Sequence, residues 1–318
     1  MLSALLKSLS LSEKVVIGLV LVEQSSLTAL LIKLMGVSLM FKMRKVTEDE
    51  VIQHEKNIEN YGYTLVPKFI PTDDVELILK RVNHLFSLRD NNGYSGVPDR
   101  DVKDKIIYNL QNKHISFIRL FMDPFIRNLL IKKLNDPFYR FLPQEVPNYI
   151  LNYYNARSSG EALDLHIDSH IPAISSQIWA MQVAFILEEQ NEQNGCTVVV
   201  PGSHLSGKYT DRAMKDVKPV ISKPGDLVIW DSRLWHGTLK NKANVSRWSL
   251  IATFTSWWLK QSMDITRSLP EEIYKSLNNE EKSILGFCSI PPASELDRIN
   301  TKTGYESLRN SVSEYYAP

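Results

Sequence analysis

The pattern of hydrophobic and polar positions divides the chain near residue 149. Before that point, apolar residues recur at helical spacing. Thr47, followed three residues later by Glu50, has the sequence of a capping box, which predicts that a helix begins there. The pattern predicts helices at 47–61, 72–85 and 117–134, the last interrupted near Pro124, and a short strand at 62–67.

After residue 149 the pattern changes to short runs of β-branched and aromatic residues, separated by turn pairs such as Asn194-Gly195 and Pro224-Gly225. Many short strands with such turns favour a sandwich or a barrel, and a jelly roll has a mouth that can hold a site. We therefore expect a mainly β fold with flanking helices, of the α+β class. The expected strands are 149–155, 178–187, 197–200, 226–230 and 248–257.

The first 42 residues form an apolar extension. A membrane span needs about twenty nearly uncharged residues, and Glu23 and Lys33 interrupt this segment. A span is therefore disfavoured against an amphipathic helix that contacts a membrane or a packed extension, although all three stay open. We expect the extension 1–42 to be followed by one domain, 43–318, with a β core at about 149–258 and a helical tail at 259–318.

Composition narrows the class of protein. The chain has 318 residues, of which 43% are hydrophobic and 23% charged, as in ordinary globular proteins. The net charge of +1 gives no reason to expect nucleic acid as a partner. Cys196 and Cys288 are too few for a disulfide framework, so we expect a reducing compartment such as the cytoplasm.

The candidate chemistry begins with His166-Ile167-Asp168 and the later His236. Two imidazoles and one carboxylate form the facial triad that binds Fe(II) and leaves part of its coordination sphere open. Because side chains two residues apart in a strand face the same side, we expect His166 and Asp168 to point together. A single His-x-Asp is a weak signal, because about a third of one is expected by chance in a chain with seven histidines.

Arg247 strengthens the interpretation, because an arginine beyond the last ligand can bind the far carboxylate of a keto acid. Arg247 and Ser249 share parity on a strand expected to lie beside the one that carries His236. A core histidine at 236 and a surface arginine over Trp248 are the alternatives. Each alternative is reasonable alone, but the occurrence of all these features in one order disfavours them jointly.

The chain resembles the phytanoyl-CoA dioxygenase-like branch of the Fe(II)/2-oxoglutarate oxygenases over about residues 62–257. The shared motifs here read HID, NGCTVVVPGSH, GDLVIW, HGT and RWS. The resemblance implies a double-stranded β-helix, a cupin-like jelly roll, with Fe(II) at His166, Asp168 and His236. It also implies that Arg247 binds 2-oxoglutarate and that O2 is the second cosubstrate.

Further cosubstrate contacts are suggested by the same resemblance. Thr238 matches a hydroxyl position that family members use on the same carboxylate, and Ser249 is expected to serve similarly. Asn152 lies on the strand before the His-x-Asp motif, where the family places another contact. Gln182 shares a strand face with Ala184, near which the family can have an aromatic residue. A region that often lines the pocket contains Tyr108, Asn109 and Gln111.

The remaining histidines are weaker candidates. His204 is expected to hold the PGSH turn, whereas His170, just past the His-x-Asp motif, is in a position to reach substrate. No role is assigned to His54, His84 and His114.

The implied activity is hydroxylation of an unactivated C–H bond in a small molecule or an acyl- or lipid-type substrate, with release of succinate and CO2. The carboxylate at Asp168 favours hydroxylation over halogenation. Desaturation, ring closure, a lipid hydroxylase near a membrane, and a non-catalytic jelly roll that binds or senses a ligand remain alternatives. Substrate specificity is expected in the loops 91–105 and 206–218 and in the tail from residue 260. A solvated basic loop is the favoured explanation for Lys208, Arg212 and Lys215.

Overall fold

The computed structural model describes residues 41–91, 105–139, 146–169, 171–208 and 216–290. The chain divides into two compact units, Met1–Phe41 and Lys42–Pro318, and the fold below is that of the second unit. Most of the apolar extension and the end of the predicted tail lie outside the described residues, so the expected domain boundaries stay a prediction. Within the described ranges, no helix has both the length and the apolar character needed to cross a membrane.

Two sheets of antiparallel strands form the framework. One sheet has six strands in the order β1-β8-β5-β10-β3-β2, and the other has four in the order β4-β9-β6-β7. The strands are β1 (Tyr63–Val66), β2 (Lys105–Tyr108), β3 (Ile150–Ser158), β4 (Leu163–His166), β5 (Ala180–Ile186), β6 (Thr197–Val199), β7 (Lys218–Pro219), β8 (Leu227–Asp231), β9 (His236–Thr238) and β10 (Ser249–Thr255).

A hydrophobic core joins the two sheets. Strands β5 and β8 of the six-stranded sheet contribute to it together with Val199 of β6 in the four-stranded sheet. Burying one such side chain contributes about 1.5–3 kcal/mol, which offsets the entropy lost on ordering the strands. The expected jelly roll, a double-stranded β-helix, is confirmed. The core consists of Ala184, Ile186, Val199, Val220, Val228, Trp230 and Leu234.

Two of the three predicted helices begin within one residue of the predicted start, and the third begins two residues earlier than predicted. Thr47 and Glu50 form the expected capping box at the start of α4 (Glu48–Tyr61). The helix expected at 72–85 is α5 (Thr72–Asn91) and continues further than predicted. The interruption near Pro124 separates α7 (Ile115–Leu120) from α8 (Pro124–Leu134), because proline is tolerated in the first turn of a helix but not in its interior. The tail contains α9 (Ile265–Ser268), α10 (Glu271–Ser276) and α11 (Asn279–Ile284).

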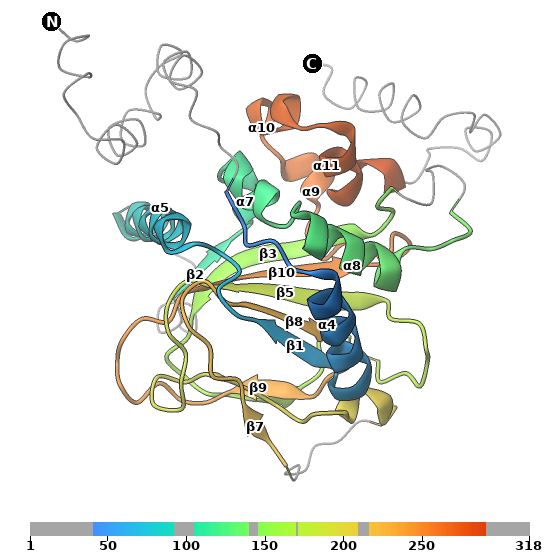
Figure 1. Ribbon diagram of the computed structural model, residues 1–318. Coiled ribbons are helices and arrows are strands. Elements are labelled where there is room, and N and C mark those ends of the chain that lie inside the picture. Colours follow the sequence, from blue (N-terminus) through green and yellow to red (C-terminus); the bar gives the residue numbers. More distant parts are fainter. Residues whose placement is uncertain (1–40, 92–104, 140–145, 170, 209–215, 291–318) are drawn as a thin grey trace, which may run out of the picture. The chain divides into compact units, whose positions relative to one another are not determined.

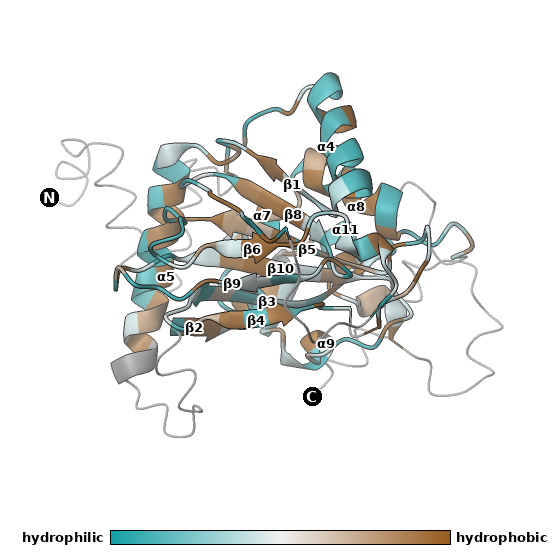
Figure 2. Ribbon diagram, turned by 90° about the horizontal axis from the view of Figure 1, so that it is seen from below, coloured by the Kyte–Doolittle hydropathy of each residue, from teal (hydrophilic) through white to brown (hydrophobic). Residues whose placement is uncertain are grey.

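These helices cover the outer face of the six-stranded sheet. In Figure 1, α7, α8, α10 and α11 lie on one side of β3, β10 and β5, and β9 and β7 lie on the other. Aromatic contacts hold this layer: the rings of Phe121 and Phe254 are 5.2 Å apart, and those of Phe121 and Tyr154 are 5.8 Å apart. Figure 2 shows α4 with alternating hydrophobic and hydrophilic colour, as expected of a helix with one covered face. The inner face of the sheet is thus left for the core and for a site.

The position of β10 corrects one expectation. It pairs with β3 and β5 in the six-stranded sheet, whereas His236 lies on β9 in the other sheet. The strand after Arg247 is therefore opposite the strand of His236 and not beside it. The jelly roll brings these segments together across its interior, which strand order along the sequence does not reveal.

Candidate metal centre

Three predicted ligands converge at one end of the four-stranded sheet. His166 ends β4 and His236 begins β9, and the two are directly opposite each other in the strand pair. Asp168 has Oδ1 3.5 Å from His166 Nε2 and Oδ2 3.3 Å from His236 Nε2. One ligand atom from each residue lies within 4.8 Å of the others. Two imidazole nitrogens and a carboxylate oxygen are the donor set suited to Fe(II).

Backbone carbonyls orient both imidazoles. Nδ1 of His166 lies 2.8 Å from the carbonyl oxygen of Asp164, and Nδ1 of His236 lies 2.9 Å from that of Leu234. A carbonyl can only accept, so each Nδ1 must carry the proton and donate it. The lone pair of each ring is then on Nε2, the atom that faces Asp168. This arrangement is the one that outer hydrogen bonds impose on histidine ligands of metals.

Asp168 reaches the site by a route that differs from the predicted one. Strand β4 ends at His166, so Asp168 lies in the following turn and not two residues along a strand. The backbone N–H groups of Asp168 and Ser169 both donate to the carbonyl of Ser232, at 2.9 and 3.0 Å. A contact with the turn after β8, and not strand parity, therefore directs the carboxylate toward the histidines.

The electrostatics favour a charged carboxylate. Burial raises the pKa of Asp168, but His236 and His166 outweigh it and hold that pKa well below its ordinary range. For His236, burial lowers the pKa, but the charge of Asp168 and the hydrogen bonds to Asp168 and Leu234 raise it further, so the net pKa is raised. The cluster thus carries a negative group suited to a cation.

The triad is more open on one side than on the other. The side chain of His166 is 35% exposed, whereas that of His236 is 9% exposed. Solvent and small molecules therefore reach the cluster from the His166 side.

Gly237 lets β9 approach β4 closely, because a Cβ on this residue would lie 2.4 Å from the carbonyl oxygen of Leu163.

A row of side chains on the six-stranded sheet faces the triad. Its members are successive cross-strand partners and so project from one face. The ring of Trp230 lies 5.5 Å from the ring of His236, which identifies that face as the inner one. Burial, followed by the charge of Asp168, raises the pKa of Tyr153, so this hydroxyl stays protonated. Strand by strand, the row consists of Tyr153, Thr253, Gln182 and Trp230.

Asn152 is turned away from this row. Its Oδ1 accepts from the backbone N–H of Ser262 at 3.0 Å, and its Nδ2 is 3.4 Å from the carbonyl oxygen of Lys260. The register of β3 and β10 shifts between Thr253 and Phe254, so Asn152 is the extra residue of a bulge. Its amide thus holds the segment after β10, whereas Tyr153 is the β3 residue in the row that faces the triad. The cosubstrate contact expected at Asn152 stays a prediction.

Arg247 and the predicted hydroxyl residues lie further from the metal end. Arg247 is 4% exposed and donates through Nε to the carbonyl of Ser159 at 3.1 Å. Burial raises the pKa of the Cys196 thiol, whereas the charge of Arg247 acts to lower it. Cys196 directly precedes Thr197, the residue that pairs with Thr238. The Thr238 hydroxyl accepts from Leu163 N–H at 3.1 Å, and Ser249 is buried at the start of β10. The Arg247 guanidinium is therefore buried beside Ser159, two residues before β10 begins.

The other candidates have different surroundings. Gln182 is fully buried, and its Oε1 accepts from the Ser232 hydroxyl at 2.8 Å. Ala184 belongs to the core between the sheets. Tyr108 is half-exposed on β2, and neither polar atom of the buried Gln111 amide has a hydrogen-bond partner within the described ranges.

Three of the other histidines make contacts that stabilise the fold. His204 Nε2 donates to the Glu59 carbonyl at 3.1 Å, and His54 Nδ1 is 2.8 Å from the Thr64 hydroxyl. His114 caps α7 by accepting from Ser116 N–H. His84 is exposed on α5, and His170, Arg212 and Lys215 lie outside the described residues.

Sequence reasoning missed three residues around the triad. Ser232 accepts the Asp168 N–H, Arg233 pairs with Asp231 in the same turn, and Tyr153 lies in the row that faces the triad. None of them belongs to a motif, so they become visible only through the register of the strands and the turn after β8. Strand parity could have distinguished Tyr153 from Asn152 if the bulge had been known.

Comparisons with known proteins agree with this geometry. The family described as "Phytanoyl-CoA dioxygenase (PhyH)" matches residues 58–249. "Dioxygenase af480" of Aspergillus fumigatus is 23% identical over 248 residues, covering 74% of this chain and 77% of that protein. "Dioxygenase andF" of Emericella variicolor is 30% identical over 108 residues, 34% of this chain and 38% of its own length.

Solved structures share the fold. The non-heme α-ketoglutarate-dependent epimerase SnoN from nogalamycin biosynthesis is 16% identical with a TM-score of 0.54, covering 71% of this chain and 89% of that chain. HygX from Streptomyces hygroscopicus, solved with nickel and 2-oxoglutarate, is 15% identical with a TM-score of 0.52, covering 69% and 90%. Because the family match extends over more than half of the sequence, the chain belongs to the phytanoyl-CoA dioxygenase family.

Proposed function

We propose that this protein is an Fe(II)- and 2-oxoglutarate-dependent dioxygenase that hydroxylates a C–H bond of a small organic substrate. The observation that carries the proposal is the triad, in which both Nε2 atoms face one carboxylate at 3.3 and 3.5 Å. The family match supports it, as does the similarity in fold to HygX, which was solved with 2-oxoglutarate bound.

The residues present fit the metal. His166, Asp168 and His236 supply two neutral nitrogens and one charged oxygen, and three ligands leave coordination positions for a chelating keto acid and oxygen. The Nδ1 atoms of both imidazole rings are already hydrogen-bonded to backbone carbonyls, so the rings need little reorientation when the metal binds.

The interior also fits the keto acid. The buried guanidinium of Arg247 suits a carboxylate, because a buried cation is stabilised by a charged partner with good hydrogen-bond geometry. Within the described ranges, Trp230 Nε1 and Asn155 Oδ1 are buried polar atoms that have no hydrogen-bond partner. A polar ligand between the triad and Arg247 would give these buried atoms a hydrogen-bond partner. We assign Thr238 and Ser249 to the carboxylate end and Gln182 to the metal end.

When bound, the iron would supply the oxidation, with the keto acid consumed to succinate and CO2. The protein orients the ligands, binds the far carboxylate and excludes bulk water from the apolar side of Trp230. The Tyr153 hydroxyl, whose pKa burial and the Asp168 charge raise, stays protonated and remains a hydrogen-bond donor on the inner face.

An anaerobic titration tests this proposal without knowledge of the substrate. Fe(II) is added to the protein, followed by 2-oxoglutarate, and the visible metal-to-ligand charge-transfer band of a chelated keto acid is recorded. We expect the band in wild type, its loss in His166→Ala and its weakening in Arg247→Leu. His84→Ala, which changes an exposed histidine on α5, serves as the matched control. A folded wild type that gives no band contradicts the proposal.

The reaction outcome needs a separate measurement. SnoN is described as an epimerase, so a shared fold does not define hydroxylation. With a substrate found by screening, mass spectrometry distinguishes a gain of one oxygen atom from a loss of two hydrogens, and the latter would replace hydroxylation by desaturation or ring closure. A charge-transfer band without any consumption of 2-oxoglutarate in air would favour a binding or sensing module.

A further inference from the structure

The turn between β8 and β9 contains a buried ion pair. Arg233 Nη2 lies 2.6 Å from Asp231 Oδ2, and Arg233 Nε lies 3.0 Å from Asp231 Oδ1. The backbone N–H of Arg233 also donates to Asp231 Oδ1 at 2.9 Å. The Arg233 and Asp231 side chains are 5% and 0% exposed, so this pair is not a solvated surface contact. A bidentate pair of this kind fixes the conformation of the turn that it closes.

The same guanidinium holds the segment after the His-x-Asp motif. Nη1 of Arg233 donates to the carbonyl of Ser175 at 2.7 Å and lies 3.3 Å from that of Ala173. One side chain thus joins the turn after β8 to the connection between β4 and β5. A lysine cannot replace these contacts, because its single ammonium cannot reach the carboxylate and two carbonyls in the fork geometry of a guanidinium.

Two carbonyls of this turn contact the predicted ligands. The Ser232 carbonyl accepts the N–H of Asp168 at 2.9 Å, and the Leu234 carbonyl accepts Nδ1–H of His236 at 2.9 Å. Ser232 also donates its hydroxyl to Gln182 on the inner face of β5. A turn fixed by one ion pair therefore sets the direction of one carboxylate and one imidazole.

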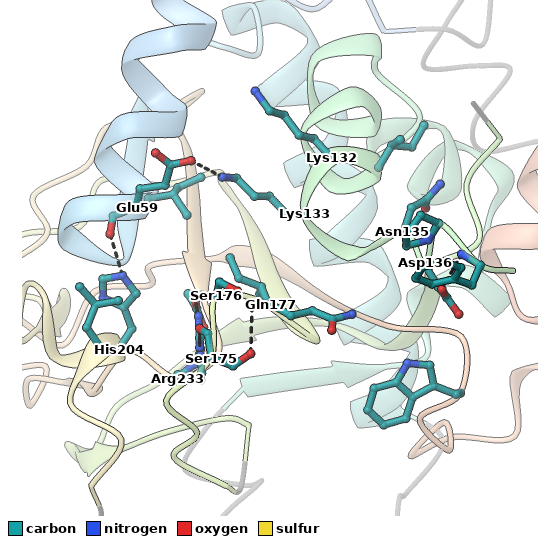
Figure 3. A pocket seen from close by; sticks show the side chains of 18 residues that line it. Glu59, Lys132, Lys133, Asn135, Asp136, Ser175, Ser176, Gln177, His204 and Arg233 are labelled. Carbon is teal, nitrogen blue, oxygen red and sulfur yellow. Dashed lines mark hydrogen bonds and ion pairs between the residues drawn. The ribbon is translucent and has the colours of Figure 1, made fainter. Parts of the chain in front are cut away.

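The side chain of Arg233 lies in the wall of a pocket, and not in the interior that contains the triad. Asp231 and Arg233 line a pocket of about 1020 Å³ that is also bounded by α4, α8 and residues 175–178. Figure 3 shows Arg233 beside Ser175 in this pocket, with His204 and Gln177 on neighbouring walls. Successive side chains of the turn thus point in opposite directions. Asp231 and Arg233 face the pocket, whereas the Ser232 hydroxyl faces Gln182 in the interior of the jelly roll.

We propose that Arg233, paired with Asp231, is a positioning residue that aligns Asp168 and His236 for the metal before the metal binds. This inference rests on the proposed function. Arg233 acts through the Ser232 and Leu234 carbonyls and through the segment 173–175, and does not itself touch metal or cosubstrate. The carboxylate reaches its place although β4 ends at His166, because this turn supplies the acceptor for its backbone.

The test compares two variants with wild type in the anaerobic Fe(II) titration. Arg233→Lys keeps the charge but loses the fork, and the double variant Asp231→Asn/Arg233→Gln removes both charges without leaving one buried alone. We expect both to bind Fe(II) about 10–100-fold more weakly, as for the loss of outer-shell partners, with a shifted charge-transfer band. Arg127→Gln, which breaks the Arg127–Glu280 ion pair between α8 and α11, is the control and is expected to bind as wild type.

The outcomes separate the two proposals. A wild type without the band contradicts the proposed function. A wild type with the band, together with Arg233 variants of equal affinity and unchanged spectrum, overturns only the positioning role. Circular dichroism recognises a variant that has lost its structure, and Arg127→Gln shows the effect of breaking an ion pair away from the triad.

Hydrogen exchange on wild-type protein gives an answer that does not depend on whether a variant folds. If the turn aligns the ligands in advance, the amides of Asp168 and Ser169 are protected in metal-free protein, because both donate to Ser232. Rapid exchange of both amides, with protection only after Fe(II) is added, would overturn the inference.

Discussion

Asp168 is the residue on which the metal centre depends most. It is the single negatively charged member of the proposed triad, the two histidines hold its pKa well below the ordinary range, and its carboxylate oxygens lie 3.5 and 3.3 Å from the two Nε2 atoms. Arg247 is the residue that we propose for the keto acid, since its guanidinium is buried. If both assignments hold, substitutions at Asp168 and Arg247 should have separable effects, one on metal binding and one on cosubstrate binding.

Asp168→Ala is expected to abolish the charge-transfer band and any hydroxylation, because two neutral imidazoles remain without a charged ligand. The measurement is the anaerobic titration, followed by 2-oxoglutarate consumption in air. Asp164→Ala is the matched control, since it removes an exposed carboxylate but keeps the backbone carbonyl that orients His166. Turnover retained in Asp168→Ala would refute the ligand assignment.

Arg247→Leu is expected to raise the concentration of 2-oxoglutarate needed for half-saturation by about tenfold or more, which corresponds to about 1.4 kcal/mol. The carboxylate loses a charged partner, whereas Fe(II) affinity without the keto acid should stay near wild type. Arg267→Leu, at an exposed position in α9, is the control. An unchanged requirement for 2-oxoglutarate would assign the carboxylate to another cation.

At the scale of elements, the caps and close approaches of individual helices and strands have measurable consequences. α7 is capped by a histidine, and β9 approaches β4 at a glycine. Both features lie in short elements, which depend on tertiary contacts because isolated helices and hairpins of this length are marginal.

The cap of α7 predicts a pH dependence of stability. His114 Nδ1 accepts from Ser116 N–H and from Arg81, so the cap needs the neutral ring. Burial, with the charges of Arg81 and Arg119, lowers the pKa of His114 from 6.5 to about 3. Only the unfolded chain therefore takes up this proton below pH 6.5, and the free energy of unfolding falls as the pH drops from 6.5 toward 3.

Denaturant unfolding at several pH values checks this expectation against His114→Asn, which keeps a capping side chain but does not titrate. The variant should lose less stability than wild type between neutral and acid pH. Equal pH profiles for the two proteins would exclude His114 as the titrating group.

Gly237→Ala is expected to separate β9 from β4, because the added Cβ would lie 2.4 Å from the Leu163 carbonyl oxygen. The pair of His166 and His236 should then bind Fe(II) at least about tenfold more weakly, since misplaced ligands lose affinity. Gly202→Ala strains a residue with φ of +80° but meets only one atom, at 3.6 Å, and serves as the control. It should lower thermal stability without weakening Fe(II) binding, and the opposite pattern would contradict the explanation.

At the scale of the whole molecule, the triad joins three segments of the jelly roll. β4 and its following turn, the turn after β8, and β9 all contact one another at the cluster. A metal that binds there binds the folded state and not the unfolded chain, so occupancy and global stability are linked.

Fe(II) or a redox-inert substitute such as Ni(II) is therefore expected to raise the melting temperature. At a free concentration about 100 times the dissociation constant, the gain is about 2.7 kcal/mol. Asp168→Ala should show no such shift, and a chelator should reverse it in wild type. Differential scanning calorimetry measures the shift, and a wild type that melts at the same temperature with and without metal would count against a metal site in the folded state.

The sequence by itself determined the local features. The capping box at Thr47 and Glu50, the break at Pro124 and the succession of short strands depend on neighbours along the chain, so the pattern predicts them. The HID and HGT motifs likewise identify the candidate metal ligands, because each motif is a short stretch of consecutive residues. The family resemblance also predicted the double-stranded β-helix, which the strand pairing and the comparisons confirm.

Only the tertiary structure decided which side chains meet. Asp168 is directed by the Ser232 carbonyl, Asn152 is displaced by a bulge, and Arg233 joins two segments far apart in the sequence. Strand register, bulges and long-range hydrogen bonds depend on the energy of contacts between distant segments. Periodicity reports the face on which a residue lies within its own element, but not the element that this face will meet.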